Sequence, residues 1–230
     1  MYPFRFVTFA LLVLGLSGCA SNGDPRDPLE PMNRGIRSFN EGLDKVLLKP
    51  VAKGYSTVVP DPIRTGVRNV FSNVDDVTVF ANDLLQFKLE QGTRDFLRFV
   101  FNTSFGILGM LDVSTEMGLN KHNEDFGQTL GYWGMPDGAY LVLPVFGPSS
   151  VRDGLGLAIE MTTTDPISTQ KAVAARNAET GIRIISRRAG LLEIKDAVDN
   201  AALDPYEFER DFYLERRRSL VYDGKPPKEE

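Results

Sequence analysis

The chain has 230 residues, of which 42% are hydrophobic and 25% are charged, and its formal net charge is −5. A mildly acidic chain with dispersed basic residues is a poor candidate for nucleic-acid binding, which requires Lys and Arg to neutralise phosphates. With one cysteine and one histidine, it can form neither an intrachain disulfide nor a zinc site with four Cys or His ligands.

The first 18 residues have the pattern of a secretory signal peptide. Arg5 is the only charge before residue 24, and an apolar run follows from Phe6 to Leu16. The run is shorter than the about 20 apolar residues that a membrane-spanning helix needs. Leu16-Ser17-Gly18-Cys19 has the lipobox pattern of bacterial lipoproteins. We therefore predict cleavage before Cys19 and acylation of its thiol; an ordinary buried N-terminal helix is the alternative.

The residues after Cys19 predict where the chain is anchored and how. Ala20 follows the cysteine, whereas bacterial sorting generally retains lipoproteins with Asp at that position in the inner membrane. We therefore expect an outer-membrane, lipid-anchored protein in the periplasmic leaflet. Residues 19–31 contain three prolines and small polar residues, a composition typical of a solvated tether.

Residues 32–222 predict one helical domain. Apolar residues recur at helical spacing over 33–48, 61–73, 75–87 and 91–105, and again near 182–192 and 208–212. Asp-Pro pairs at 61–62, 165–166 and 204–205 are typical helix starts, and we interpret Asp75-Asp76 as another. The Gly- and Pro-rich stretch 131–150 predicts a loop or short hairpin. Residues 223–230 are expected to be a disordered tail.

The stretch from Arg94 to Asp112 is too apolar for an ordinary surface helix. No charge occurs from Phe99 to Leu111, and apolar residues cover most of the helix circumference. Such a helix is either buried in protein or surrounded by lipid. As a helix, these thirteen residues would cover roughly 20 Å, enough for one leaflet. From the sequence alone a central core helix is favoured, and an anchored cysteine nearby shifts the balance toward lipid.

Basic residues cluster toward the C-terminus, and two interpretations remain open for them. They either contact lipid phosphates or an acidic partner, or they form solvated helix faces with interleaved Glu. The residues are Arg183, Arg187, Arg188, Arg210 and Arg216 to Arg218.

No pattern of catalytic residues is recognisable. His122 would have to serve any Ser-His-Asp triad, and its charged neighbours predict an exposed turn. We interpret Glu124-Asp125 as a cap for the next element. The chain contains neither a P-loop nor a dinucleotide-binding glycine motif, so we expect no enzyme, no cofactor and no metal.

Several long motifs, in order over residues 24–220, resemble the VacJ/MlaA family of outer-membrane lipoproteins. Small departures from the family pattern occur in turns, at Asp76 and Ala139. The matching motifs are Asp27-Pro-Leu-Glu-Pro-Met-Asn33-Arg34, Val59-Pro-Asp-Pro-Ile-Arg64-Thr-Gly66, Arg98-Phe-Val-Phe-Asn102-Thr103, Glu124-Asp125-Phe126-Gly127-Gln-Thr129, Tyr140-Leu-Val-Leu-Pro144 and Leu203-Asp204-Pro205-Tyr206.

The resemblance implies an all-α fold: a ring-like assembly of amphipathic helices with a short hairpin, embedded in one leaflet around an amphipathic channel. It implies removal of mislocalised phospholipid from the outer leaflet, which maintains lipid asymmetry. It also implies three protein partners, namely a trimeric porin, a soluble periplasmic lipid carrier and, through the carrier, an inner-membrane ABC transporter. The direction of net flow rests on the resemblance alone.

Residue roles are assigned on this basis. Cys19 is the anchor, and two glycines, Gly106 and Gly109, would let the backbone bend. Tyr132, Trp133 and Tyr140 would gate the pore or lie at the membrane interface, and an ordinary loop with a buried aromatic is the alternative. The candidate lipid-facing or core residues are Phe96, Phe99, Phe101, Phe105, Leu108 and Leu111.

Two other functions remain open. A structural lipoprotein could scaffold porins or envelope assembly without moving lipid. A hydrolase would depend on His122.

Overall fold

The computed structural model describes residues 24–195 and 203–227. The predicted signal peptide, Cys19 and the first residues of the tether lie outside the described residues. The expected all-α fold with one hairpin is confirmed: helices dominate, and β1 (Tyr140–Leu143) pairs antiparallel with β2 (Gly147–Ser150). Within the described ranges, no helix combines the length and apolar character needed to cross a membrane.

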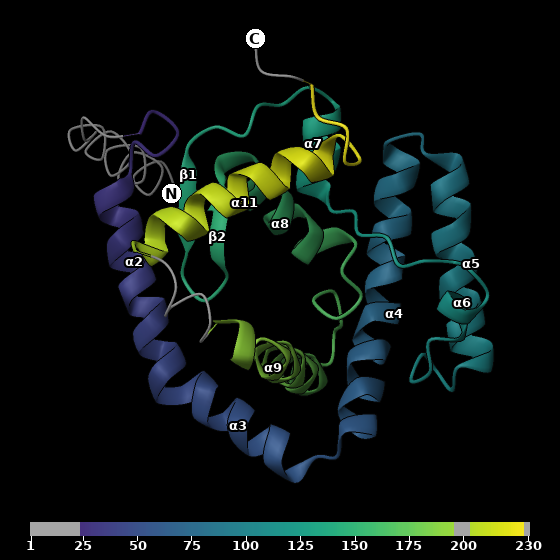
Figure 1. The fold of residues 1–230 in the computed structure, drawn as a ribbon. Coiled ribbons are helices and arrows are strands. Elements are labelled where there is room, and N and C mark those ends of the chain that lie inside the picture. The colour runs from purple at the N-terminus through teal and green to yellow at the C-terminus, as the bar shows by residue number, and fades with distance from the viewer. Residues whose placement is uncertain (1–23, 196–202, 228–230) are drawn as a thin grey trace, which may run out of the picture.

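In Figure 1 the first helices run round three sides of the molecule, and later helices return to the space between them. A long arm contains α2 (Glu30–Leu43), a π-helical segment η2 (Asp44–Leu48) and α3 (Lys49–Val58). Next comes α4 (Asp61–Leu85), with α5 (Leu89–Phe105) packed along its outer side. The short α6 (Val113–Glu116) follows, and then α7 (Phe126–Tyr132). After the hairpin come α8 (Val151–Thr163), α9 (Val173–Gly190), which packs on α3 and α4, and α11 (Pro205–Val221).

The first arm runs past the predicted helix end at Leu48 because the π-helical segment accommodates Pro50. Proline removes one backbone N–H and clashes with the carbonyl four residues earlier. The wider π turn avoids this conflict, with Lys49 N–H bonded to the Asp44 carbonyl. Sequence patterns that end a helix near a proline miss this continuation.

Two asparagines attach α2 to the hairpin. Asn33 and Asn40 lie seven residues apart and therefore on one face of the helix. The Asn33 amide donates to the Tyr140 carbonyl at 3.0 Å and accepts from Val142 N–H at 2.9 Å. Asn40 donates to the Leu143 carbonyl and accepts from Val145 N–H. The helix thus satisfies the exposed edge of β1 with side-chain amides.

The predicted tether and tail are partly wrong where the structure describes them. Asp27 is fully buried and accepts hydrogen bonds from Asn33 and from the Tyr206 hydroxyl, so the body begins before residue 32. Asp223, at the start of the predicted tail, accepts a hydrogen bond from Lys88 at 2.7 Å. Residues 228–230 lie outside the described part.

Two of the predicted helix starts are also wrong. Asp75 and Asp76 lie inside α4, which is one continuous 25-residue helix. Asp165-Pro166 forms a turn, and α9 begins only at Val173. The start at Asp204-Pro205 is confirmed, because the Asp204 carboxylate accepts from Tyr206 and Glu207 N–H at the start of α11.

Candidate lipid-contacting surface

Helix α5 presents its apolar side chains outward. Phe96 is 46% exposed and Phe105 is 69% exposed, while Phe99 and Phe101 are half-buried. The buried side of the same helix carries Asp95, Arg98 and Asn102, at helical spacing. The favoured prediction of a central core helix is therefore wrong, because the face of α5 that packs against protein is the polar one.

The helix ends at Phe105, so the predicted thirteen-residue helix to Leu111 is also wrong. The chain reverses through Ile107, Leu108 and Gly109, whose φ angles are 53°, 55° and 89°. Residues other than glycine rarely adopt this left-handed backbone conformation, because it costs each of them roughly 1–2 kcal/mol. The reversal leaves Leu108 72% exposed and Leu111 53% exposed. The strained backbone at this reversal places apolar side chains on the outside of the fold.

Both predicted hinge glycines are required by close contacts at this reversal. A Cβ on Gly109 would lie 2.7 Å from the Asn73 Cβ, and a Cβ on Gly106 would collide with the Leu111 carbonyl. Gly109 N–H and Leu111 N–H close the turn on the Asn102 and Gly106 carbonyls, at 2.8 and 2.9 Å. The glycines therefore allow a fixed tight reversal.

Arg98 fixes the reversal from inside. It is 2% exposed, and its guanidinium donates to Asp112 at 3.1 and 3.2 Å and to the Thr115 hydroxyl at 3.0 Å. Asp112 also caps α6 by accepting from Thr115 N–H. Burial alone would raise the pKa of Asp112, but the hydrogen bonds from Thr115 and Asn102 and the charge of Arg98 hold it below its usual value.

The arrangement seen in α5, with polar side chains buried and apolar side chains exposed, is an inverted distribution that extends over the described residues. Among the described residues, seven hydrophobic side chains are buried, against twenty-three polar or charged ones. A protein in water normally shows the opposite pattern, with charged residues almost never fully buried unless paired. Large exposed apolar side chains occur on most helices and include Phe39, Leu47, Val58, Ile63, Leu85, Phe87, Leu89, Ile107, Phe208 and Phe212. Such an extensive apolar exterior marks a surface that contacts membrane or protein.

The C-terminal arginines mostly point inward, so neither sequence interpretation describes them well. Arg217 donates to Asp125 at 2.5 Å and to Asp153 at 2.9 Å. Burial would raise the pKa of Asp153, but Arg217 and Tyr213 outweigh it and keep the carboxylate ionised. Arg188 pairs with Asp44, Arg183 with Asp75, and Arg210 with Asp24 and Asp27. Of the cluster, Arg187 and Arg216 are exposed.

The three predicted gate residues divide into two groups. Tyr132 and Trp133 are about half exposed, and the Trp133 indole N–H donates to the Leu85 carbonyl at 3.1 Å. Tyr140 is fully buried and packs edge-on against Tyr206 and Tyr213. An interfacial position for Tyr140 is therefore wrong, because its ring belongs to the small apolar core.

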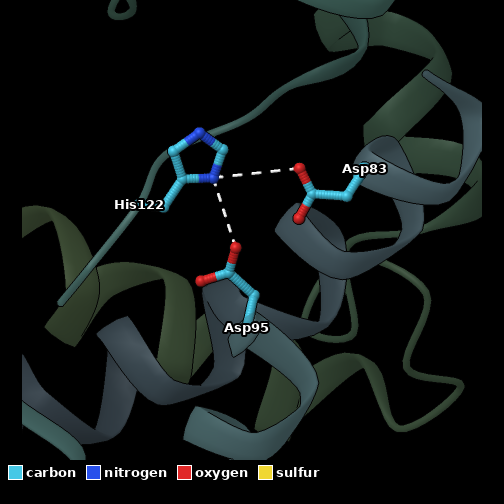
Figure 2. A group of neighbouring side chains, drawn as sticks. All are labelled: Asp83, Asp95 and His122. Atoms are coloured by element: carbon cyan, nitrogen blue, oxygen red, sulfur yellow. Dashed lines mark hydrogen bonds and ion pairs between the residues drawn. The ribbon is translucent and has the colours of Figure 1, made fainter. Parts of the chain in front are cut away.

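His122 does not form the expected exposed turn. Figure 2 shows its ring directed at Asp83 of α4 and Asp95 of α5. The His122 Nδ1 lies 3.2 Å from Asp95 Oδ2 and 3.8 Å from Asp83 Oδ1, and its Nε2 lies 3.6 Å from Glu124 Oε1. Sequence reasoning missed both aspartates. The signal for Asp83 was the recurrence of Asp and Asn on one face of α4, at 73, 76 and 83.

Comparisons with known proteins agree with this geometry. A family model described as MlaA lipoprotein matches residues 25–220. The chain is 31% identical to the intermembrane phospholipid transport system lipoprotein MlaA of Haemophilus influenzae, over 95% of this chain and 91% of the relative. It is 32% identical to the Escherichia coli protein of the same name, over 96% and 90%. A solved structure from work on maintenance of bacterial outer membrane lipid asymmetry superimposes with a TM-score of 0.74 at 31% identity, covering 85% of this chain and 98% of that one.

Proposed function

The chain belongs to the MlaA lipoprotein family, and we propose that it removes mislocalised phospholipid from the outer leaflet of the outer membrane. In this proposal the lipid passes through an amphipathic channel to a soluble periplasmic carrier linked to an inner-membrane ABC transporter. The protein moves lipid without chemical change, so it is not an enzyme. A trimeric porin is the proposed neighbour in the membrane.

The inverted distribution of polar and apolar side chains is the observation that carries this proposal. A body whose exterior is apolar is stable in acyl chains, where exposed Leu and Phe side chains meet a solvent of their own polarity. Its buried ion pairs would offer polar partners to a phospholipid head group within the hydrocarbon region. An unpaired charge there costs several kcal/mol of free energy. The α5 residues and the reversal after them are the proposed lipid-contacting surface. Tyr132 and Trp133 lie near the turn between α4 and α5, where they contact Lys88 and Leu85.

A polar cavity between α2, α3 and α9 supports a head-group path. It has a volume of about 380 Å³ and is lined by Arg37, Lys45, Lys49, Arg188 and Lys195, together with the carboxylates of Glu41 and Asp44. Basic side chains outnumber acidic ones at this wall, which suits a phosphodiester. The volume fits a head group rather than a pair of acyl chains, so we place the tails at the apolar exterior.

The anchor completes the arrangement. Acylation of Cys19 would hold a body without a spanning helix at one leaflet, since two or more acyl chains give stable anchoring. Asp27, eight residues after the cysteine, is already fully buried in the body. The body therefore lies within reach of the bilayer surface, which favours immersion over a soluble position in the periplasm.

The test is deletion of the gene followed by measurement of outer-leaflet phospholipid. We expect that phospholipid to rise, with greater sensitivity to detergent and chelator, and the wild-type gene to restore both. A Cys19→Ala variant should fail to restore them while leaving porin trimer levels normal. Normal leaflet composition in the deletion strain would contradict the proposal. Loss of porin trimers with unchanged lipid would instead favour the scaffold function.

A further inference from the structure

The Asp83, Asp95 and His122 side chains form a group that lipid passage does not use. They come from α4, from α5 and from the segment before α7, three parts of the chain that meet only in the fold (Figure 2). Gly92 lets the helices approach at this level, because a Cβ there would lie 3.2 Å from the Asp83 Cβ. Asp95, one turn after Gly92, is thereby brought next to Asp83.

Three carboxylate oxygens in this group have no hydrogen-bond partner. Asp83 and Asp95 are both fully buried, yet both oxygens of Asp83 and the Oδ1 of Asp95 are unpartnered. A buried carboxylate without partners is costly, and two side by side also repel each other. A protonated His122, a proton shared by the two carboxylates or a bound cation would neutralise the pair.

The donor geometry fits a metal ion. One donor atom from each residue can be chosen so that all lie within 4.8 Å of one another. Metal–ligand bonds of about 2.0–2.2 Å in a tetrahedral site place neighbouring donors roughly 3.3–3.6 Å apart. The His122 Nδ1 lies 3.2 and 3.8 Å from the two carboxylate oxygens, on either side of that value. Small side-chain adjustments would complete the site.

The surrounding residues hold the donors in place. Gln91 donates to Asp95 Oδ2 at 3.0 Å, and Glu124 faces the other His122 nitrogen at 3.6 Å. A carboxylate on the far nitrogen of a ligating histidine is the usual support at such sites. Glu124 is itself fixed by Gln86 and Lys88, each at 2.8 Å. His122 also lines a cavity of about 980 Å³, so the imidazole is reached from that cavity, whereas the two aspartates lie behind it and are fully buried.

We propose that Asp83, Asp95 and His122 bind a first-row divalent transition-metal ion, for which Zn²⁺ is the test ion. Two carboxylates and one imidazole suit such an ion, whereas Mg²⁺ and Ca²⁺ prefer oxygen ligands alone. The ion joins α4, α5 and the segment before α7. It therefore braces the helix pair that carries the apolar reversal at residues 106–111.

The experiment is a calorimetric titration of the full-length, detergent-solubilised protein with Zn²⁺ after treatment with a chelator. We expect one ion per chain and an affinity for Mg²⁺ at least a hundredfold weaker than that for Zn²⁺. His122→Gln and Asp95→Asn should each weaken Zn²⁺ binding at least tenfold. His122→Gln changes a partly exposed side chain, and circular dichroism would verify that both variants fold.

The matched control is Asp223→Asn, because His122, Glu124 and Asp223 form a second possible ligand group on the other side of the imidazole. Asp223→Asn should bind Zn²⁺ within threefold of the wild type. Absence of Zn²⁺ binding would overturn the proposal in favour of a protonated His122 or a shared proton. A loss in Asp223→Asn as large as that in Asp95→Asn would overturn the assigned ligands. Neither outcome touches lipid transport, since the titration involves no phospholipid.

Discussion

Replacing Leu108 by Asp should weaken membrane binding without weakening the fold. Leu108 is 72% exposed at the reversal after α5. Complete burial of a leucine is worth about 1.5–3 kcal/mol, so transfer of its exposed part to lipid contributes about 1–2 kcal/mol. An Asp within the hydrocarbon adds a penalty of about 2.5–3.5 kcal/mol. Together these terms predict a loss of about 3.5–5.5 kcal/mol, or between several hundred-fold and about ten-thousand-fold in membrane affinity.

The same substitution should leave stability in water unchanged or slightly higher. The φ of Leu108 is 55°, a left-handed conformation in which Asp and Asn are enriched and leucine is strained. Loss of membrane affinity therefore cannot be attributed to unfolding. A lower membrane affinity together with an unchanged or higher stability in water distinguishes a lipid-facing leucine from one that packs against protein.

The assay is co-flotation with phosphatidylethanolamine vesicles, using a chain that begins at residue 24 so that no acyl anchor contributes. Thermal unfolding followed by circular dichroism gives the stability. Leu108→Ala should lose only about tenfold in affinity, and Asn120→Asp, which adds the same charge on an exposed polar loop, should change affinity little. Equal vesicle binding by Leu108→Asp and the wild type would refute a lipid-contacting reversal.

Three further predictions concern the interior. Arg98→Met removes the guanidinium partner of Asp112 and should lower the free energy of unfolding, measured by denaturant titration, by about 3–5 kcal/mol. The double variant Arg98→Met/Asp112→Asn should recover part of this loss. Additive losses would contradict the pairing. Burial, followed by the charge of Asp125, raises the pKa of Glu160 to about 7 from an unfolded value of 4.5. The folded state then binds more protons than the unfolded state, so stability falls as pH rises between these values, by at most about 3 kcal/mol. Glu160→Gln should flatten this slope in unfolding midpoints from pH 5 to 8, and an unchanged slope would exclude Glu160 as its source. Gly109→Ala should lower the melting temperature more than Gly118→Ala, because both have positive φ but only Gly109 faces a close neighbour; equal shifts would mean that the Asn73 contact is irrelevant.

Local signals in the sequence identified many of the elements correctly. The presence of a helix over residues 91–105, the hairpin near Tyr140 and the cap at Asp204 follow from apolar spacing, Gly and Pro content and one carboxylate. Each depends on residues within a few positions of one another, so a linear reading captures it. The continuation of the first helix through Pro50 was not predicted, because a π turn does not alter the spacing of apolar residues in a recognisable way.

The orientation of the helices could not be predicted in the same way. An amphipathic pattern shows that a helix has two faces, but the rule that the apolar face is the inner one assumes water outside. For α5 that assumption favoured a core helix, whereas the structure buries Asp95, Arg98 and Asn102. The predicted acylation of Cys19 was the one feature of the sequence that indicated the opposite.

The ion-pair partners of the buried charged residues could not be predicted from the sequence either. Arg217 meets Asp125 over 92 positions, and Arg188 meets Asp44 over 144. Nothing local distinguishes such an arginine from one on a solvated helix face. The Asp83, Asp95 and His122 group escaped for the same reason, since its three residues come from separate segments.

A polar interior made of paired charges suits transport better than one made of isolated charges. An isolated guanidinium would bind a phosphate tightly and retain it, and an isolated carboxylate would exclude it. The basic residues at the cavity between α2, α3 and α9 lie beside carboxylates, as Arg188 does beside Asp44. Under the proposed function, a phosphate that enters this cavity would exchange one charge-assisted hydrogen bond for another, because Arg188 already has a carboxylate partner. We infer that a head group would bind weakly here, so that a lipid could leave again without an energy source within this chain.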